Sequence, residues 1–163
     1  MSFIVVIRGS LACGKTTISK KLSEIIKAKY ISIDEILETK GLDNDWQEGY
    51  ISEKSFIKAN ETILPSAKKI LGKGKPIIFD GNFYWKSQLD DLIKKLNFPH
   101  YIFTLKAPLK VCIERDAKRT KPHGEDAAKA VFKKSNEFDY GILIDVTKNL
   151  RSCLDEIISY LPK

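Results

Sequence analysis

The segment Gly9–Thr16 limits what this chain can fold into more than any other stretch. It reads Gly-Ser-Leu-Ala-Cys-Gly-Lys-Thr, a pattern typical of loops that bind phosphate. The short apolar run Phe3–Arg8 precedes it and predicts a buried strand. Apolar residues at helical spacing follow it to about Ala28 and predict a helix. Strand, loop and helix together are the context that such a loop requires.

Each part of this loop has a chemical role. Glycines let the backbone curl so that successive N–H groups point at phosphate oxygens, and the helix adds its partly positive N-terminus. The Lys15 amine would bridge the β- and γ-phosphates of a nucleotide, and the Thr16 hydroxyl would ligate Mg²⁺. The expected nucleotide-binding residues are Gly9, Ser10, Leu11, Ala12, Cys13, Gly14, Lys15, Thr16 and Thr17. An accidental glycine turn is disfavoured, because motif and context agree.

Composition excludes several classes of protein. The chain has 163 residues, 43% of them hydrophobic, which suits one domain with a sizeable core. Its net charge of +7 favours anionic ligands such as nucleotides and leaves a nucleic-acid surface open. No apolar run approaches the ~20 residues that a membrane helix needs. The N-terminal apolar run before Gly9 is also too short for a signal peptide. The three cysteines, Cys13, Cys112 and Cys153, are an odd number without metal-ligand spacing. They fit a reducing compartment better than a disulfide framework, so we expect a cytoplasmic protein.

Strand-like and helix-like segments alternate along the whole chain, which predicts a single α/β domain over residues 1–163. The expected strands are residues 3–8, 29–33, 76–80, 100–105 and 141–146. The expected helices after the first are residues 52–71, 86–96, 108–120, one from about 125, and 148–160. Pro65 should kink or split the first of these helices.

On these motifs the whole chain resembles the small P-loop kinases, the group of adenylate and shikimate kinases. It resembles most closely the branch with chloramphenicol phosphotransferase, zeta toxins, seryl-tRNA kinases and polynucleotide kinases. The resemblance implies a three-layer P-loop NTPase fold with a five-stranded parallel sheet in the order 2-3-1-4-5. It also implies ATP and Mg²⁺ as cofactors, an acceptor-lid region over residues 35–75 and a short lid over residues 115–130. In these kinases the loop after the fifth strand, here Val146–Asn149, lines the adenine pocket.

Asp34 follows the second expected strand in "ISIDEI". Ligands of parallel α/β sheets bind at the carboxyl ends of the strands, so Asp34 and the glycine loop should share one crevice. A carboxylate there can accept the proton of an attacking hydroxyl, and the resemblance implies this role. The alternative is that Asp34 only caps a helix beginning at Glu35.

The third expected strand ends in "IIFDGNFYW". Asp80 there would support Mg²⁺ beside Thr16. The "D-x-N-x-Y" form of seryl-tRNA-kinase-like proteins implies acceptor contacts for Asn82 and Tyr84. The aromatic residues could stack on an acceptor ring or belong to the core, and both interpretations stay open.

Arginine is scarce in this lysine-rich chain and occurs only at Arg8, Arg115, Arg119 and Arg151. Arg115 and Arg119 are four residues apart, on one face of an expected helix, in a segment that resembles the lid of these kinases. Their guanidinium groups could neutralise charge on the transferred phosphoryl group. The alternative is surface ion pairing.

The scarcity of arginine also indicates which kind of molecule accepts the phosphoryl group. Enzymes that phosphorylate a nucleoside monophosphate grip the acceptor phosphate through bidentate arginines, and none lies between Arg8 and Arg115. We therefore expect ATP-dependent transfer to a hydroxyl of a small or nucleoside-type molecule, with Trp46 in a short acceptor lid. Three alternatives stay open: a nucleotide kinase, a kinase of RNA or tRNA ends, and a P-loop NTPase or nucleotide-binding regulator.

Overall fold

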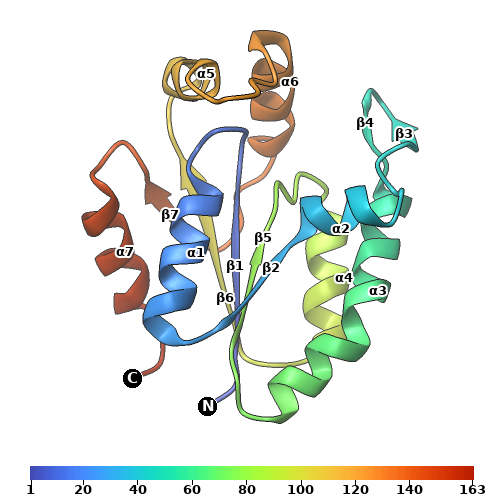
Figure 1. Cartoon of the computed structure of the whole chain (residues 1–163), viewed down its shortest axis with the longest axis vertical. Coiled ribbons are helices and arrows are strands. Elements are labelled where there is room, and N and C mark those ends of the chain that lie inside the picture. Colours follow the sequence, from blue (N-terminus) through green and yellow to red (C-terminus); the bar gives the residue numbers. More distant parts are fainter.

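Strand β1 (Ile4–Gly9) forms the centre of the molecule, and all six of its residues are buried (Figure 1). The computed structural model describes residues 1–163. The other strands of the main sheet are β2 (Lys29–Ser32), β5 (Ile77–Asp80), β6 (His100–Lys106) and β7 (Ile142–Asp145). The helices are α1 (Lys15–Ile26), α2 (Ile33–Thr39), α3 (Glu53–Gly72), α4 (Lys86–Leu96), α5 (Leu109–Ala117), α6 (Glu125–Ser135) and α7 (Leu150–Ser159). A two-stranded hairpin, β3 (Trp46–Gln47) and β4 (Tyr50–Ile51), precedes α3.

The five sheet strands are parallel and lie in the order β2-β5-β1-β6-β7. Counted without the hairpin, this is the predicted order 2-3-1-4-5, and the predicted fold class is confirmed. Side chains of β1 alternate between two cores, because successive residues of a strand point to opposite faces. Ile4 and Val6 pack with α3 and α4, and Val5 and Ile7 pack with α1 and α7. Figure 1 shows these two helix pairs on opposite sides of the sheet.

Two segments differ from the sequence-based expectation. The irregular region after Asp34 contains both a short helix, α2, and the β3–β4 hairpin. Helix α3 runs from Glu53 to Gly72 without interruption, so Pro65 does not split it. The stripe Ile63, Ala67 and Leu71 is buried on both sides of the proline, and this packing offsets the roughly 3 kcal/mol that an interior proline costs. None of the helices combines the length and the apolar character needed to cross a bilayer.

Arg8 is fully buried at the carboxyl half of β1. Its guanidinium donates to the carbonyl oxygens of Phe83 at 3.3 Å and Ser135 at 2.9 Å, and to the Thr104 hydroxyl at 3.0 Å. It also stacks on the Phe138 ring, 4.3 Å from the ring centroid. Burial lowers the pKa of Arg8 to about 10, so the side chain stays charged at neutral pH. One side chain therefore ties the central strand to the loop after β5 and to the end of α6.

Replacing Arg8 with alanine should lower the free energy of unfolding by about 3 kcal/mol, because buried carbonyl oxygens lose their donor. Urea denaturation followed by circular dichroism measures the change. Arg151→Ala is the matched control, since Arg151 is exposed and pairs only with Asp155 on the next turn of its helix. The control should change stability by less than about 0.5 kcal/mol. Equal losses in the two variants would contradict the structural role of Arg8.

Candidate active site

The glycine loop connects β1 to α1 at the carboxyl edge of the sheet. A Cβ atom at Gly9 would lie 2.8 Å from Cys13 Sγ and 3.0 Å from the Leu105 carbonyl oxygen, so only glycine fits between the loop and β6. Gly14 has a φ of 95°, a conformation that other residues rarely adopt. It begins α1 without a side-chain cap, which leaves the first amide groups of the helix free for an anion.

Lys15 lies across the mouth of this loop. Its amine donates to the Ser10 carbonyl oxygen at 2.7 Å, and the side chain is buried. The contact holds a positive charge over the amide groups of the loop. Loop and lysine together form a cradle for a chain of phosphates.

Asp80 stands beside the start of α1 at the end of the neighbouring strand β5. Its carboxylate accepts hydrogen bonds from the Thr16 hydroxyl at 3.1 Å and from the Tyr30 hydroxyl at 2.7 Å. Burial and the Asp80 contact raise the pKa of Tyr30, which keeps its hydroxyl protonated and donating. Tyr30 is a residue that sequence reasoning missed, because nothing in "KYISI" distinguishes it from a core aromatic.

The Thr16 and Asp80 oxygens suit Mg²⁺, which prefers oxygen ligands and is held by few protein groups and by substrate phosphates. No group of three or more histidine, cysteine and acidic side chains in the chain could hold a metal ion by itself. A metal here would therefore complete its shell with phosphate oxygens and water.

Asp34 lies in the first turn of α2, and Ser32 is the residue that caps this helix. The Ser32 hydroxyl accepts from the Glu35 amide at 3.2 Å, so the alternative role of Asp34 as the helix cap is wrong. The Asp34 carboxylate faces the cleft and keeps accessible surface. Protein nevertheless surrounds it closely enough that burial raises its pKa, while the Lys15 charge lowers it and Asp80 raises it.

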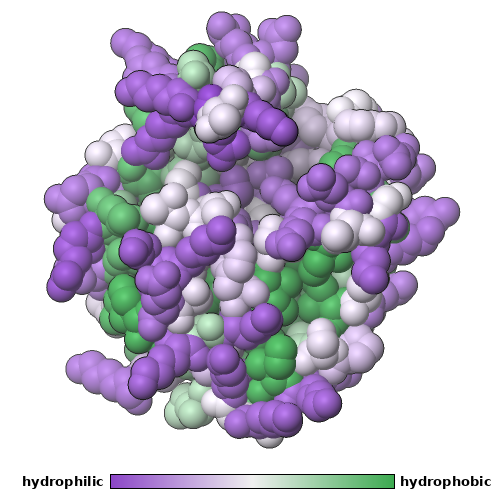
Figure 2. Space-filling model, in the orientation of Figure 1, coloured by the Kyte–Doolittle hydropathy of each residue, from purple (hydrophilic) through white to green (hydrophobic).

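These groups share one cavity of about 360 Å³ at the carboxyl edge of the sheet. Its lining is Leu11, Ala12, Gly14, Lys15, Thr16, Thr17, Asp34, Leu37, Glu38, Asp43, Ile51, Asn82, Arg119 and His123. Figure 2 shows mostly hydrophilic residues around the recess below the α5–α6 lobe at the top of the view. The structure thus brings loop, Asp34, Asn82 and Arg119 together. The Asn82 Oδ1 atom is buried without a protein partner.

Arg115 does not line the 360 Å³ cavity that contains Arg119. Its guanidinium donates to the Val146 carbonyl oxygen at 2.8 Å and to the Cys13 carbonyl oxygen at 3.4 Å. It lines a separate cavity of about 270 Å³ together with Val146 and Lys148 from the loop after β7. That loop is the segment expected at the adenine ring, so Arg115 connects the expected base and phosphate regions.

Trp46 and Tyr84 do not line the 360 Å³ cavity. Tyr84 is buried against Tyr50, Phe56 and Trp85, and its hydroxyl accepts from the Ile51 amide at 3.2 Å. The ring therefore supports the β3–β4 hairpin from inside the core. Trp46 lies on that hairpin with 64% of its surface exposed.

Sequence reasoning missed five lining residues, Leu37, Glu38, Asp43, Ile51 and His123. Leu37 and Glu38 follow Asp34 at helical spacing, a signal that becomes readable only once α2 is recognised. His123 is exposed on the lid and also lines the cavity. Asp116 explains the position: its carboxylate accepts from the His123 and Gly124 amides at 3.1 and 2.9 Å, which folds the lid over the cleft.

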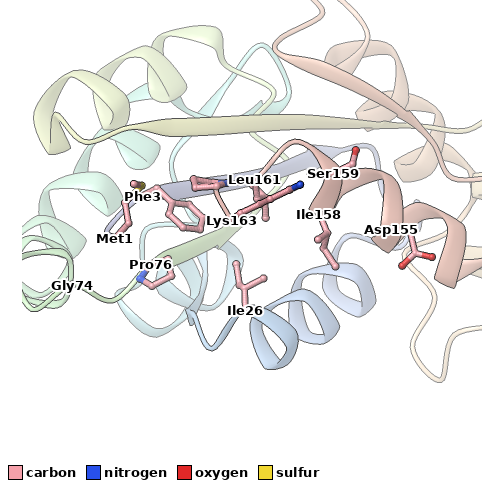
Figure 3. Close-up of a pocket in the computed structure, with 11 residues that line it drawn as sticks. Met1, Phe3, Ile26, Gly74, Pro76, Asp155, Ile158, Ser159, Leu161 and Lys163 are labelled. Atoms are coloured by element: carbon pink, nitrogen blue, oxygen red, sulfur yellow. The ribbon is translucent and has the colours of Figure 1, made fainter.

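A larger cavity of about 610 Å³ lies near the two chain termini, away from the glycine loop (Figure 3). Phe3, Ile26, Ile158 and Leu161 give it an apolar lining, and no residue of the glycine loop reaches it. Volume alone does not mark a site of chemistry. We assign the chemistry to the smaller cleft, where titratable groups and the phosphate cradle converge.

Replacing Asp80 with asparagine should weaken Mg²⁺-dependent nucleotide binding by about tenfold, because the group that supports the metal loses its charge. Titration of a fluorescent ATP analogue with and without Mg²⁺ measures this, and binding without Mg²⁺ should change little. Asp145→Asn is the matched control, since Asp145 also ends a strand of the sheet but its carboxylate accepts hydrogen bonds only from Thr147. A loss that is equal with and without Mg²⁺ would refute the metal role.

Comparison with known proteins agrees with this geometry. The chain is similar in structure to a sugar kinase from Janibacter sp., with a TM-score of 0.77, 15% identity, and coverage of 98% of this chain and 94% of the other. It is similar to a tunicamycin resistance protein from Deinococcus radiodurans, with a TM-score of 0.71, 17% identity, and coverage of 98% of this chain and 95% of the other. A gluconokinase from Sinorhizobium meliloti gives a TM-score of 0.67, 13% identity, and coverage of 95% of this chain and 89% of the other. The fold is thus that of small P-loop kinases. The family model described as "AAA domain" matches residues 4–138, and the chain belongs to this family.

Proposed function

We propose that this protein is an ATP- and Mg²⁺-dependent kinase that transfers the γ-phosphate to a hydroxyl group of a small molecule. The observation that carries the proposal is the shared cavity. Lys15, Thr16, Asp34 and Arg119 line one space of about 360 Å³, so a phosphate cradle, a candidate base and a lid cation face each other. A protein that only senses a nucleotide has no use for a carboxylate opposite the cradle.

Each residue then has a chemical task. Asp34 accepts the proton of the attacking hydroxyl, whose oxygen forms a bond to the γ-phosphorus as the bond to the β–γ bridging oxygen breaks. Lys15 and Arg119 balance the negative charge that spreads over the phosphoryl oxygens. A bound Mg²⁺ supplies further neutralisation of the phosphates, and Thr16 and Asp80 are the residues that would hold it. Asn82 also lines the cavity, and its Oδ1, which has no partner in the protein, can accept a hydrogen bond from the acceptor.

The cavity lining favours a hydroxyl acceptor over a phosphorylated one. The acceptor side contributes Asp34, Glu38 and Asp43 but no arginine, and Arg119 enters from the lid. An acceptor phosphate there would meet carboxylates instead of the bidentate arginines that such groups need. The nucleotide-kinase alternative is therefore the weaker one. A polynucleotide acceptor would also require a contiguous basic track leading to Asp34.

Asp34→Asn should reduce phosphoryl transfer by at least about a hundredfold, because general bases contribute roughly 10²–10⁴ in rate. Binding of ATP should persist, since the cradle is unchanged. Radiolabelled γ-phosphate followed into product, with nucleosides, sugars and amino alcohols as acceptors, measures transfer. Glu35→Gln is the control, because it removes a neighbouring charge outside the cavity and should leave the rate nearly unchanged. Full transfer by the asparagine variant would exclude Asp34 as the base.

The pH profile tests the same role independently. Asp34 must be ionised to accept a proton, so activity falls as the pH falls through its pKa. Burial raises that pKa, and the acidic limb of kcat/KM should therefore lie above the range of an ordinary aspartate. Since the Arg119 charge lowers the pKa, Arg119→Gln should move the limb to higher pH in the activity that remains. Lys118→Gln, outside the cavity, should leave the limb in place.

A further inference from the structure

The acceptor side of the cleft is acidic in a chain that is basic as a whole. Asp34, Glu38 and Asp43 line it, although the chain carries a net charge of +7. None of the three forms an ion pair, whereas acidic residues elsewhere pair with Lys86, Lys95, Lys106 and others. Asp34 and Glu38 are exposed to the cleft and Asp43 is half-buried, so all three carboxylates are free to bind a cationic group of a ligand.

The cations of the cavity serve the other side. Lys15 donates to the Ser10 carbonyl oxygen over the phosphate cradle, and Arg119 belongs to the lid. Glu38 follows Asp34 by one helical turn on α2, and Leu37 lies between them on the same face. The half-buried Asp43 comes from the loop after α2. Lys15 and Arg119 thus provide the positive charge for the phosphates, and the three carboxylates remain for the acceptor.

A second metal ion does not explain the three carboxylates, since they are not close enough to hold one together. They are spread along a wall that also contains Leu37, Ile51 and the unpartnered Asn82 oxygen. Such a wall suits an organic molecule with separate polar groups on a small apolar frame. The cavity of about 360 Å³ would also have to hold the phosphate end of the nucleotide, which limits the acceptor to a small molecule.

We propose that the acceptor carries a protonated amine beside the hydroxyl that is phosphorylated, as amino alcohols and amino sugars do. Glu38 and Asp43 bind the ammonium group through charge-assisted hydrogen bonds, which leaves Asp34 to take the hydroxyl proton. An acidic acceptor would be repelled by the same wall, and a neutral polyol would gain no charge-assisted hydrogen bond from Glu38 and Asp43. This inference rests on the proposed function and specifies its substrate class.

The experiment measures kcat/KM with radiolabelled ATP for amino sugars and amino alcohols such as glucosamine and serinol. Each amine is paired with its N-acetyl derivative, which keeps the frame and removes the charge. Each amine that is phosphorylated should exceed its N-acetyl partner by about tenfold or more. Glu38→Gln and Asp43→Asn should each raise the KM for the amine by about tenfold and reduce this preference. Glu35→Gln, on the same helix outside the cavity, is the matched control.

The KM for ATP reports folding of the variants and should stay within about twofold, because the phosphate cradle is intact. Preference for the N-acetyl partners, or an unchanged preference in both variants, overturns the amine inference and leaves the kinase proposal standing. Label recovered only as inorganic phosphate with every acceptor overturns the kinase proposal and, with it, the inference.

Discussion

The pairing of β1 with β5 on one side and β6 on the other places the glycine loop and Asp80 side by side. Because the three strands are parallel and β1 is buried along its whole length, the loop after it emerges at the middle of the carboxyl edge. Asp80 at the end of β5 then stands beside Thr16 without any special contact to bring it there. Arg8 fixes the same edge from below, through carbonyl oxygens of the loop after β5 and the end of α6.

The cleft divides its charges between two ends. Backbone amides, Lys15 and the lid residue Arg119 provide positive potential where phosphates would lie, and Asp34, Glu38 and Asp43 line the same cavity with carboxylates. Such a division orients a bound pair of substrates as well as attracting them, because each end repels the group that belongs at the other. Asp116 contributes by holding the turn after α5, which keeps Arg119 and His123 over the cleft.

Sequence reasoning identified the fold, the glycine loop and the carboxylates at the strand ends, because each depends on a local pattern. The loop has a fixed spacing, and Asp34 and Asp80 follow short runs that predict strands. It could not separate Arg115 from Arg119, since helical spacing gives a shared face but not the direction of each side chain. It also could not assign Tyr84 to the core, because the hairpin that Tyr84 supports is formed by a polar, irregular segment. Sequence reasoning also could not place Glu38 and Asp43 in the cavity, because their positions depend on where α2 ends within this irregular segment.

The central claim is that the γ-phosphate reaches a hydroxyl of an organic acceptor and not water. The most direct measurement is ³¹P NMR of the reaction with ATP, Mg²⁺ and acceptor in water enriched with ¹⁸O. Direct transfer predicts a new phosphomonoester resonance without an isotope shift, since no solvent oxygen enters the product. Inorganic phosphate carrying ¹⁸O, with no phosphomonoester from any acceptor, would contradict the account.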